Sequence, residues 1–235
     1  MRTSRAAGLV FLATATLAQQ QQPVEITSEP SHHLVFQNEY VRVFDVTVAP
    51  KATTLVHKHN HDYLFVTLGD SDVVSARPGE KPVALKLKDG EVRFTPGNFA
   101  HAAINNSDRP FHNITIELLK PTTNEQQCTV NCSPDPVGAE TFTRLYASDQ
   151  WTISLVTLSP KKSHMGHLGE NLPQLIVAVS DVSLELPTKA PDHLMHHNPG
   201  DLEWVPARSA SISSGDLKEP ARFVLLEFNS QKARP

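Results

Sequence analysis

The feature that most constrains the fold of this 235-residue chain is an internal repeat with a constant offset of 110 residues. The pattern V-T-x-x-P-K at residues 46–51 returns at residues 156–161. Single identities at the same offset occur at His57, Gly90, Pro96, Pro110 and Glu117. A fixed offset over such a length indicates two copies of one structural unit. We therefore predict a first domain at 30–121, a linker at 122–138 and a second domain at 139–230.

Each unit is predicted to consist of β-strands. Residues 151–158 (WTISLVTL) begin with apolar and polar side chains in alternation, which is the period of a half-buried strand. Short β-branched or aromatic runs bounded by Gly, Pro, Asn or Asp predict further strands at 64–68, 72–76, 91–95, 113–119, 175–179 and 222–228. No amphipathic helical pattern of useful length is present. Units of about 90 residues built in this way are typical of all-β sandwiches or closed barrels.

The overall composition excludes some partners. The formal net charge is −4, so the basic excess that marks a nucleic-acid-binding protein is absent. Hydrophobic residues make up 39% of the chain, which is enough to expect a folded protein. We therefore expect no nucleic-acid partner.

The first 18 residues resemble an export signal. Arg2 and Arg5 give a basic start, and residues 6–18 form a short apolar stretch that ends at the small residue Ala18. This stretch is shorter than the roughly 20 residues that a membrane-spanning helix needs. We expect cleavage after residue 18 and a secreted or periplasmic protein without a stable membrane anchor.

The chain has only two cysteines, Cys128 and Cys132, and both fall in the predicted linker. In an exported protein two thiols this close are able to pair as a disulfide. A role as metal ligands is the alternative, but no second Cys pair or nearby His completes a zinc set.

Residues 57–63 (HKHNHDY) place His57, His59 and His61 at alternate positions just before an apolar run. Residues i and i+2 of a strand point to the same face, about 6.5–7 Å apart. Such imidazoles either converge on a metal ion or form a polar strand edge. The pattern alone leaves both alternatives open.

A second segment makes the pattern more specific. Residues 96–105 (PGNFAHAAIN) contain Pro96, Gly97, His101 and Asn105. Together with His57-Lys-His59, this resembles the two motifs of the cupin family, an HxH pair and a later P-x-G…H…N segment. The resemblance implies an all-β fold of two tandem double-stranded β-helix (jelly-roll) barrels, a bicupin.

The resemblance also implies a divalent transition metal in the first barrel, held by His57, His59 and His101. The ion would be Fe, Mn, Ni, Cu or Zn, and the sequence does not decide between them. The position of the family's usual glutamate falls at Tyr63, whose phenol has an ordinary pKa near 10 and is a poor ligand. Asp62 and His61 remain alternatives as an additional ligand or as groups that support the ligands.

The expected substrate pocket beside this metal would be shaped by Tyr63, Phe65, Phe94 and Asn105. In the second unit the motif is degenerate. His57 is matched by His167, whereas Gly169 and Ser211 stand at the positions of His59 and His101. We therefore expect the second barrel to be structural. His193, His196 and His197 are predicted to lie in a loop.

The cupin resemblance implies a metal-dependent enzyme, a dioxygenase or isomerase, that acts on a small organic molecule. A fold alone does not fix the reaction. The alternative is a non-catalytic bicupin that binds a metal or small ligand, or a storage-like protein. The substrate and the oligomeric state stay open, and a homo-oligomer is among the alternatives.

Overall fold

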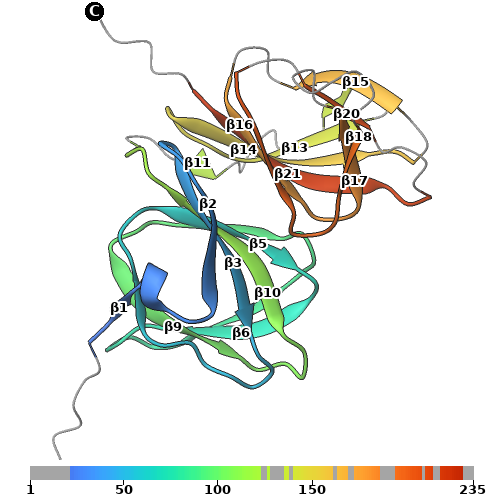
Figure 1. Cartoon of the computed structure of the whole chain (residues 1–235). Coiled ribbons are helices and arrows are strands. Elements are labelled where there is room, and N and C mark those ends of the chain that lie inside the picture. Colours follow the sequence, from blue (N-terminus) through green and yellow to red (C-terminus); the bar gives the residue numbers. More distant parts are fainter. Residues whose placement is uncertain are drawn as a thin grey trace, which may run out of the picture.

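A computed structural model provides the structure of the chain, and it has an all-β architecture (Figure 1). It describes residues 22–122, 126–127, 135–137, 140–160, 163–168, 172–185, 194–207, 210–213 and 218–229. The predicted export signal and both cysteines, Cys128 and Cys132, lie outside the described residues. Within the described residues, no helix has the length and apolar character needed to cross a membrane.

The first barrel consists of two five-stranded sheets. One sheet has the strand order β1 (Val24–Glu25), β4 (His57–His59), β9 (Phe99–Asn105), β6 (Ser71–Ala76) and β7 (Val83–Leu87). The other has the order β2 (His32–Gln37), β3 (Val41–Val48), β10 (Phe111–Leu118), β5 (Tyr63–Leu68) and β8 (Val92–Thr95). A 3-10 turn, η1 (Ile26–Ser28), follows β1. Strand β1 precedes the expected domain start at residue 30, and it pairs with β4.

The second barrel repeats this arrangement. Its larger sheet has the order β11 (Gln126–Gln127), β13 (Glu140–Ala147), β14 (Trp151–Leu158), β21 (Ala221–Phe228), β16 (Gln174–Ala178) and β19 (Leu202–Val205), and β12 (Asp135–Val137) pairs with β13. The smaller sheet has the order β15 (Ser163–Leu168), β20 (Ala210–Ser213), β17 (Val182–Glu185) and β18 (Leu194–His197). The order β13-β14-β21-β16-β19 matches β2-β3-β10-β5-β8, and β15-β20-β17-β18 matches β4-β9-β6-β7. The prediction of two tandem barrels is thus confirmed.

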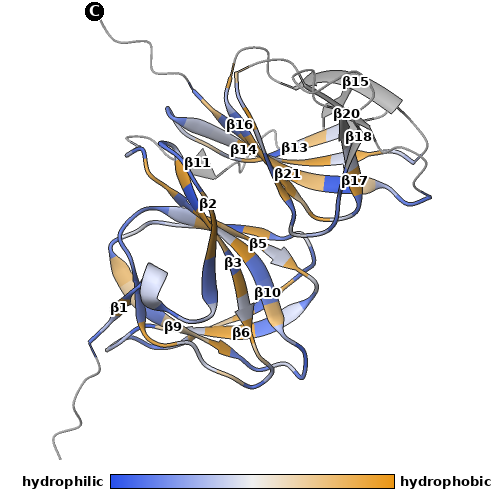
Figure 2. Cartoon of the chain, in the orientation of Figure 1, coloured by the Kyte–Doolittle hydropathy of each residue, from blue (hydrophilic) through white to orange (hydrophobic). Residues whose placement is uncertain are grey.

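The two barrels pack against each other through the outer faces of their larger sheets. Along β10, Ile114 and Ile116 point outward into a hydrophobic cluster that includes Ile153, Leu175 and Leu226 of the second barrel. Hydrophobic and hydrophilic residues accordingly alternate along β10 (Figure 2). This alternation leaves the other face of β10 free to carry polar groups into the first barrel.

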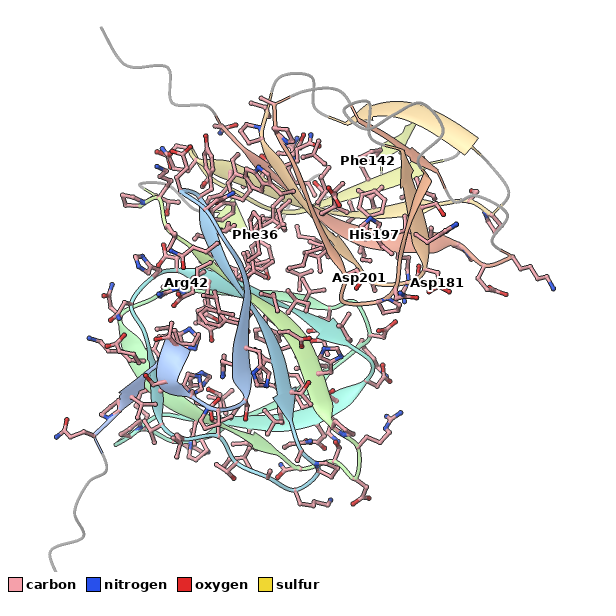
Figure 3. The ribbon with its side chains drawn as sticks, viewed as in Figure 1. Phe36, Arg42, Phe142, Asp181, His197 and Asp201 are labelled. Carbon is pink, nitrogen blue, oxygen red and sulfur yellow. The ribbon has the colours of Figure 1, made fainter. Side chains whose placement is uncertain are left out.

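Aromatic rings extend the contact between the barrels. Phe36 stacks on Trp204 with ring centroids 5.8 Å apart, and it lies between the two barrels (Figure 3). The ring centroids of Tyr40 and Phe228 lie 5.2 Å apart. Burial of these large apolar surfaces stabilises the tandem arrangement.

The interiors of the two barrels differ in polarity. On β10 of the first barrel, Asn113 and Thr115 point inward, whereas the positions 110 residues later carry Phe223 and Leu225. His32 is likewise matched by Phe142, which packs against the core of the second barrel (Figure 3). These larger apolar side chains pack in the core of the second barrel, while the first barrel keeps a cavity that His32, Asn113 and Thr115 help to line.

One prediction for the second barrel was wrong. Residues 194–197 are not a loop but strand β18, in which His196 pairs with Ser183 and His197 with Val182. The side chain of His197 is buried and that of His196 is exposed, so these two residues point to opposite faces as in an ordinary strand, a pattern that the polar composition of the segment hid. His193 lies outside the described residues.

Candidate metal centre

Strand pairing brings three histidines together inside the first barrel. His57 and His59 occupy alternate positions of β4, and both point inward. Strand β9 runs antiparallel to β4 and places His101 directly opposite His57. The three side chains, called the histidine triad below, are all buried, and their candidate ligand nitrogens lie within 4.8 Å of one another.

The nitrogens have the separation that one ion requires. Nε2 of His59 and Nε2 of His101 are 3.2 Å apart. Two imidazoles with metal bonds of about 2.0–2.1 Å, at angles between square and tetrahedral, have nitrogens about 2.9–3.4 Å apart. Nε2 of His57 is buried and has no hydrogen-bond partner. The described residues therefore offer three inward nitrogens at the spacing of a metal centre.

The opposite ring nitrogens are held by the surrounding strands. Nδ1 of His57 donates to the carbonyl oxygen of Leu55 at 2.9 Å, which leaves Nε2 unprotonated in the neutral ring. Nδ1 of His101 lies 2.9 Å from Oγ of Ser75. Groups of this kind fix the tautomer and orientation of metal-binding histidines.

The carboxylate of Glu117, which was not among the predicted site residues, lies near Nδ1 of His59. Oε1 of Glu117 lies 3.9 Å from Nδ1 of His59, and both atoms are buried without a hydrogen-bond partner. Oε2 of Glu117 accepts a hydrogen bond from Nε of Arg42 at 2.7 Å. The residue is fully buried, and its position on β10 is adjacent to Tyr63 of β5. A small movement of Glu117 would complete a carboxylate–histidine pair of the kind found around metal sites.

A second missed group is the pair of His32 and Glu29. The ring of His32 lies 4.5 Å from the ring of His57, and its Nδ1 contacts Oε2 of Glu29 at 2.6 Å. Both residues are buried. Glu29 also accepts from the backbone N–H of Ser31, which fixes the carboxylate in place.

Burial keeps the triad neutral. Desolvation, reinforced by neighbouring imidazoles, lowers the pKa of His57 to about 4 and that of His101 to about 3. The pKa of His59 is also lowered, for the same reasons. Burial raises the pKa of Glu117, although the Arg42 guanidinium acts in the opposite direction. At neutral pH protons therefore do not compete for the imidazole nitrogens.

The candidates for a fourth ligand lie elsewhere. Strand β4 ends at His59, so strand parity does not extend to His61 and no longer places its side chain on the inward face. Oδ1 of Asp62 accepts a hydrogen bond from the backbone N–H of Gly97 at 2.8 Å, which ties the two motif segments together. Neither residue belongs to the group of possible ligands in the described part of the chain.

Tyr63 occupies the sequence position of the expected carboxylate, but its side chain stacks on the imidazole ring of His59. Its phenol ring stacks on His59 with centroids 4.0 Å apart and an interplanar angle of 12°. Burial raises its pKa to about 12, so the hydroxyl stays protonated at neutral pH. Tyr63 is therefore a hydrogen-bond donor beside the triad and not an anionic ligand.

A cavity of about 400 Å³ opens beside the triad. Tyr63, Phe65 and Phe94, which the sequence analysis assigned to a substrate pocket, are among the residues that line it. Asn105 does not line it, because its buried amide donates to the carbonyl oxygens of Val48, Ala49 and Arg109. The placement of Asn105 in the pocket is therefore corrected. This residue fixes the end of β9 instead.

No protein-family model matches the sequence, and no curated protein matches it. Among solved structures, AerE from Microcystis aeruginosa has a TM-score of 0.60 at 8% identity, over 86% of this chain and 99% of that one. A cupin 2 conserved barrel domain protein from Leptotrichia buccalis has a TM-score of 0.56 at 8% identity, over 84% and 88%.

A third similar structure is a mutant of salicylate 1,2-dioxygenase from Pseudoaminobacter salicylatoxidans in complex with gentisate. Its TM-score is 0.61 at 10% identity, over 87% of this chain and 76% of that one. At these identities the likeness concerns the fold. The chain has a cupin fold, and its first barrel contains the histidine triad, whose candidate ligand nitrogens lie within 4.8 Å of one another. Its two barrels in tandem correspond to the bicupin form of this fold.

Proposed function

We propose that this bicupin is a metal-dependent enzyme of the dioxygenase type that acts on a small organic molecule. One divalent transition metal would be held by the Nε2 atoms of His57, His59 and His101. The observation that carries the proposal is the triad itself: buried, neutral imidazoles with Nε2 of His59 and of His101 3.2 Å apart. Three protein ligands leave coordination positions open for a small molecule.

The donor set fits such an ion. Imidazole nitrogen suits Fe, Ni, Cu and Zn, and the unpartnered buried Nε2 of His57 has no protein group to satisfy it. A bound metal would supply Lewis-acid or redox chemistry to a molecule in its open positions. Metal analysis of the purified protein distinguishes among Fe, Mn, Ni, Cu and Zn.

The surrounding residues would bind and orient that molecule. The protonated hydroxyl of Tyr63 is hydrogen-bonded to Thr95, and the two side chains form a polar part of the cavity wall. Phe65 and Phe94 provide an apolar wall against which that molecule would pack beside the triad. The similar dioxygenase structure that contains gentisate supports the choice of reaction class for this chain.

The second barrel is proposed to be a scaffold. The positions of Asn113 and Thr115 carry Phe223 and Leu225, which belong to its apolar core. Gly169 and Ser211 replace two triad histidines. Its contribution is the apolar surface that buries the outer face of the first barrel.

Export is proposed on sequence grounds. The basic start, the short apolar stretch at 6–18 and the small residue Ala18 support a secreted or periplasmic location. The oxidising compartment would allow Cys128 and Cys132 to pair.

The function is tested by loading metal-free protein with each candidate metal and measuring oxygen uptake with a panel of small aromatic and aliphatic molecules. The matched control is the double variant His59→Gly, His101→Ser, which copies the second barrel. Oxygen uptake by the wild type and none by the control is expected. Metal-loaded protein that binds panel molecules but never turns them over would contradict the enzyme and favour a non-catalytic binder.

A further inference from the structure

The turn between β6 and β7 places an arginine at the mouth of the cavity. The N–H of Glu80 donates to the carbonyl oxygen of Arg77 at 3.1 Å, and Gly79 between them has a φ of +79°. Pro78 precedes that glycine, so the turn has the Pro-Gly sequence that favours a type II turn. Proline and the required glycine restrict the backbone here. The position of Arg77 is therefore set by the fold before any ligand binds.

The side chain of Arg77 is held over the aromatic wall. Its guanidinium carbon lies 3.9 Å from the centroid of the Phe99 ring, a cation–π contact. The Phe99 ring in turn lies 5.3 Å from the ring of His101 and 5.6 Å from that of His59. A cation is thus held one aromatic ring away from the triad.

The charged residues that line the cavity are mostly basic. Arg77, Lys81 and Arg93 line it, against a single carboxylate, Glu80, which lies 4.0 Å from Arg77. Glu91 outside the cavity binds Nε of Arg93 at 2.6 Å. The side chain of Arg77 is 37% exposed, so a ligand is able to reach it.

The triad adds no negative charge to offset these cations. It consists of three histidines without a carboxylate, and Tyr63 stands at the sequence position where a carboxylate was expected. The nearest buried carboxylate, Glu117, is already paired with Arg42. The cavity is therefore positive with or without a metal, which favours an anionic occupant.

We propose that Arg77 is a specificity-determining residue that binds the carboxylate of a small organic acid, with the apolar body of that acid against Phe65 and Phe99. This deepens the proposed function, because it names the substrate class of the same cavity. A guanidinium matches a carboxylate with two parallel N–H···O bonds. Lys81 contributes charge at the same mouth.

The test compares two probes of the same shape, benzoate and its uncharged analogue benzamide, by calorimetric titration of metal-free and zinc-loaded protein. Wild-type protein should bind benzoate at least about tenfold more tightly than benzamide, since hydrogen bonds to charged groups discriminate by roughly ten- to a hundredfold. Arg77→Gln should remove this preference and leave benzamide binding unchanged. Arg77→Lys should restore part of it.

Lys86→Gln is the matched control, because Lys86 lies on β7 with its side chain 86% exposed and does not line the cavity. This variant removes one positive charge from the same sheet and should bind both probes like the wild type. Equal affinity for the two probes, no measurable benzoate binding, or an Arg77→Gln effect no larger than that of Lys86→Gln overturns the inference.

The metal-free titration separates the two proposals. A preference for benzoate in protein that takes up no metal would uphold this inference while the proposed metal-dependent function fails. Stoichiometric metal binding without any preference for benzoate would overturn this inference alone.

Discussion

Substitution of Glu117 is the most specific test of how the residues around the triad orient the proposed metal ligands. Its Oε1 faces Nδ1 of His59 at 3.9 Å, and its Oε2 faces Arg42. In Glu117→Gln the amide oxygen should stay with the guanidinium, which turns the amide N–H groups toward His59. Nδ1 would then accept a hydrogen bond, and the proton of the neutral ring would move to Nε2. That tautomer cannot bind a metal through Nε2.

The expected loss of metal affinity follows from the role of a carboxylate that hydrogen-bonds to a metal-binding histidine. Loss of an outer hydrogen-bond partner typically weakens metal affinity about 10–100-fold, which corresponds to about 1.4–2.7 kcal/mol. The affinity is to be measured by competition with a chromophoric chelator on folded protein. Circular dichroism in parallel separates a change in binding from a change in folding.

Glu227→Gln is the matched control for this variant. Glu227 stands 110 residues after Glu117, on β21 of the second barrel, where its carboxylate contacts Gln174. The same chemical change there should leave metal affinity at the wild-type value. Metal binding by Glu117→Gln as tight as by the wild type would refute the carboxylate–histidine pair.

Three further outcomes are expected. Because burial holds the pKa of the triad histidines at about 4 or below, metal affinity should stay flat from about pH 7.5 to 6 and fall only as the pH approaches 4. A decline that already begins near pH 7 would indicate exposed histidines. Gly97→Ala should lower the free energy of unfolding by about 1–3 kcal/mol in urea titrations, since the new methyl would lie 2.4 Å from the backbone carbon of His61; an unchanged midpoint would contradict this clash. Intact-mass spectrometry of protein from the native host should find a chain that starts at Gln19 with Cys128 and Cys132 paired, whereas an unprocessed start or free thiols would contradict export.

Much of the fold was predictable from local and repeated patterns. The repeat and the alternation of residues 151–158 predicted two similar all-β units, and β14 has those bounds. His57 and His59 share a face because strand parity is local, and the later P-G…H segment supplied His101. These features depend on spacing along the chain, which the sequence shows directly.

The groups that depend on strand register were not predictable in this way. The motif placed the expected carboxylate at Tyr63 or next to it in the chain, whereas Glu117 comes to lie beside Tyr63 through the pairing of β10 with β5. Its identity with Glu227 in the repeat was the one available signal. His32 comes to His57 from an early strand with no motif, and Asn105 points away from the cavity. Only the three-dimensional pairing of strands decides such placements.

The central claim is one metal per chain in the first barrel, and elemental analysis of purified protein tests it most directly. Wild-type protein from cells grown with ample metal should contain close to one equivalent of metal per chain. The variants His57→Ala, His59→Ala and His101→Ala should each retain almost none. His61→Ala and His167→Ala should match the wild type. A wild-type content near zero, or loss of metal in His61→Ala but not in His59→Ala, would contradict the account.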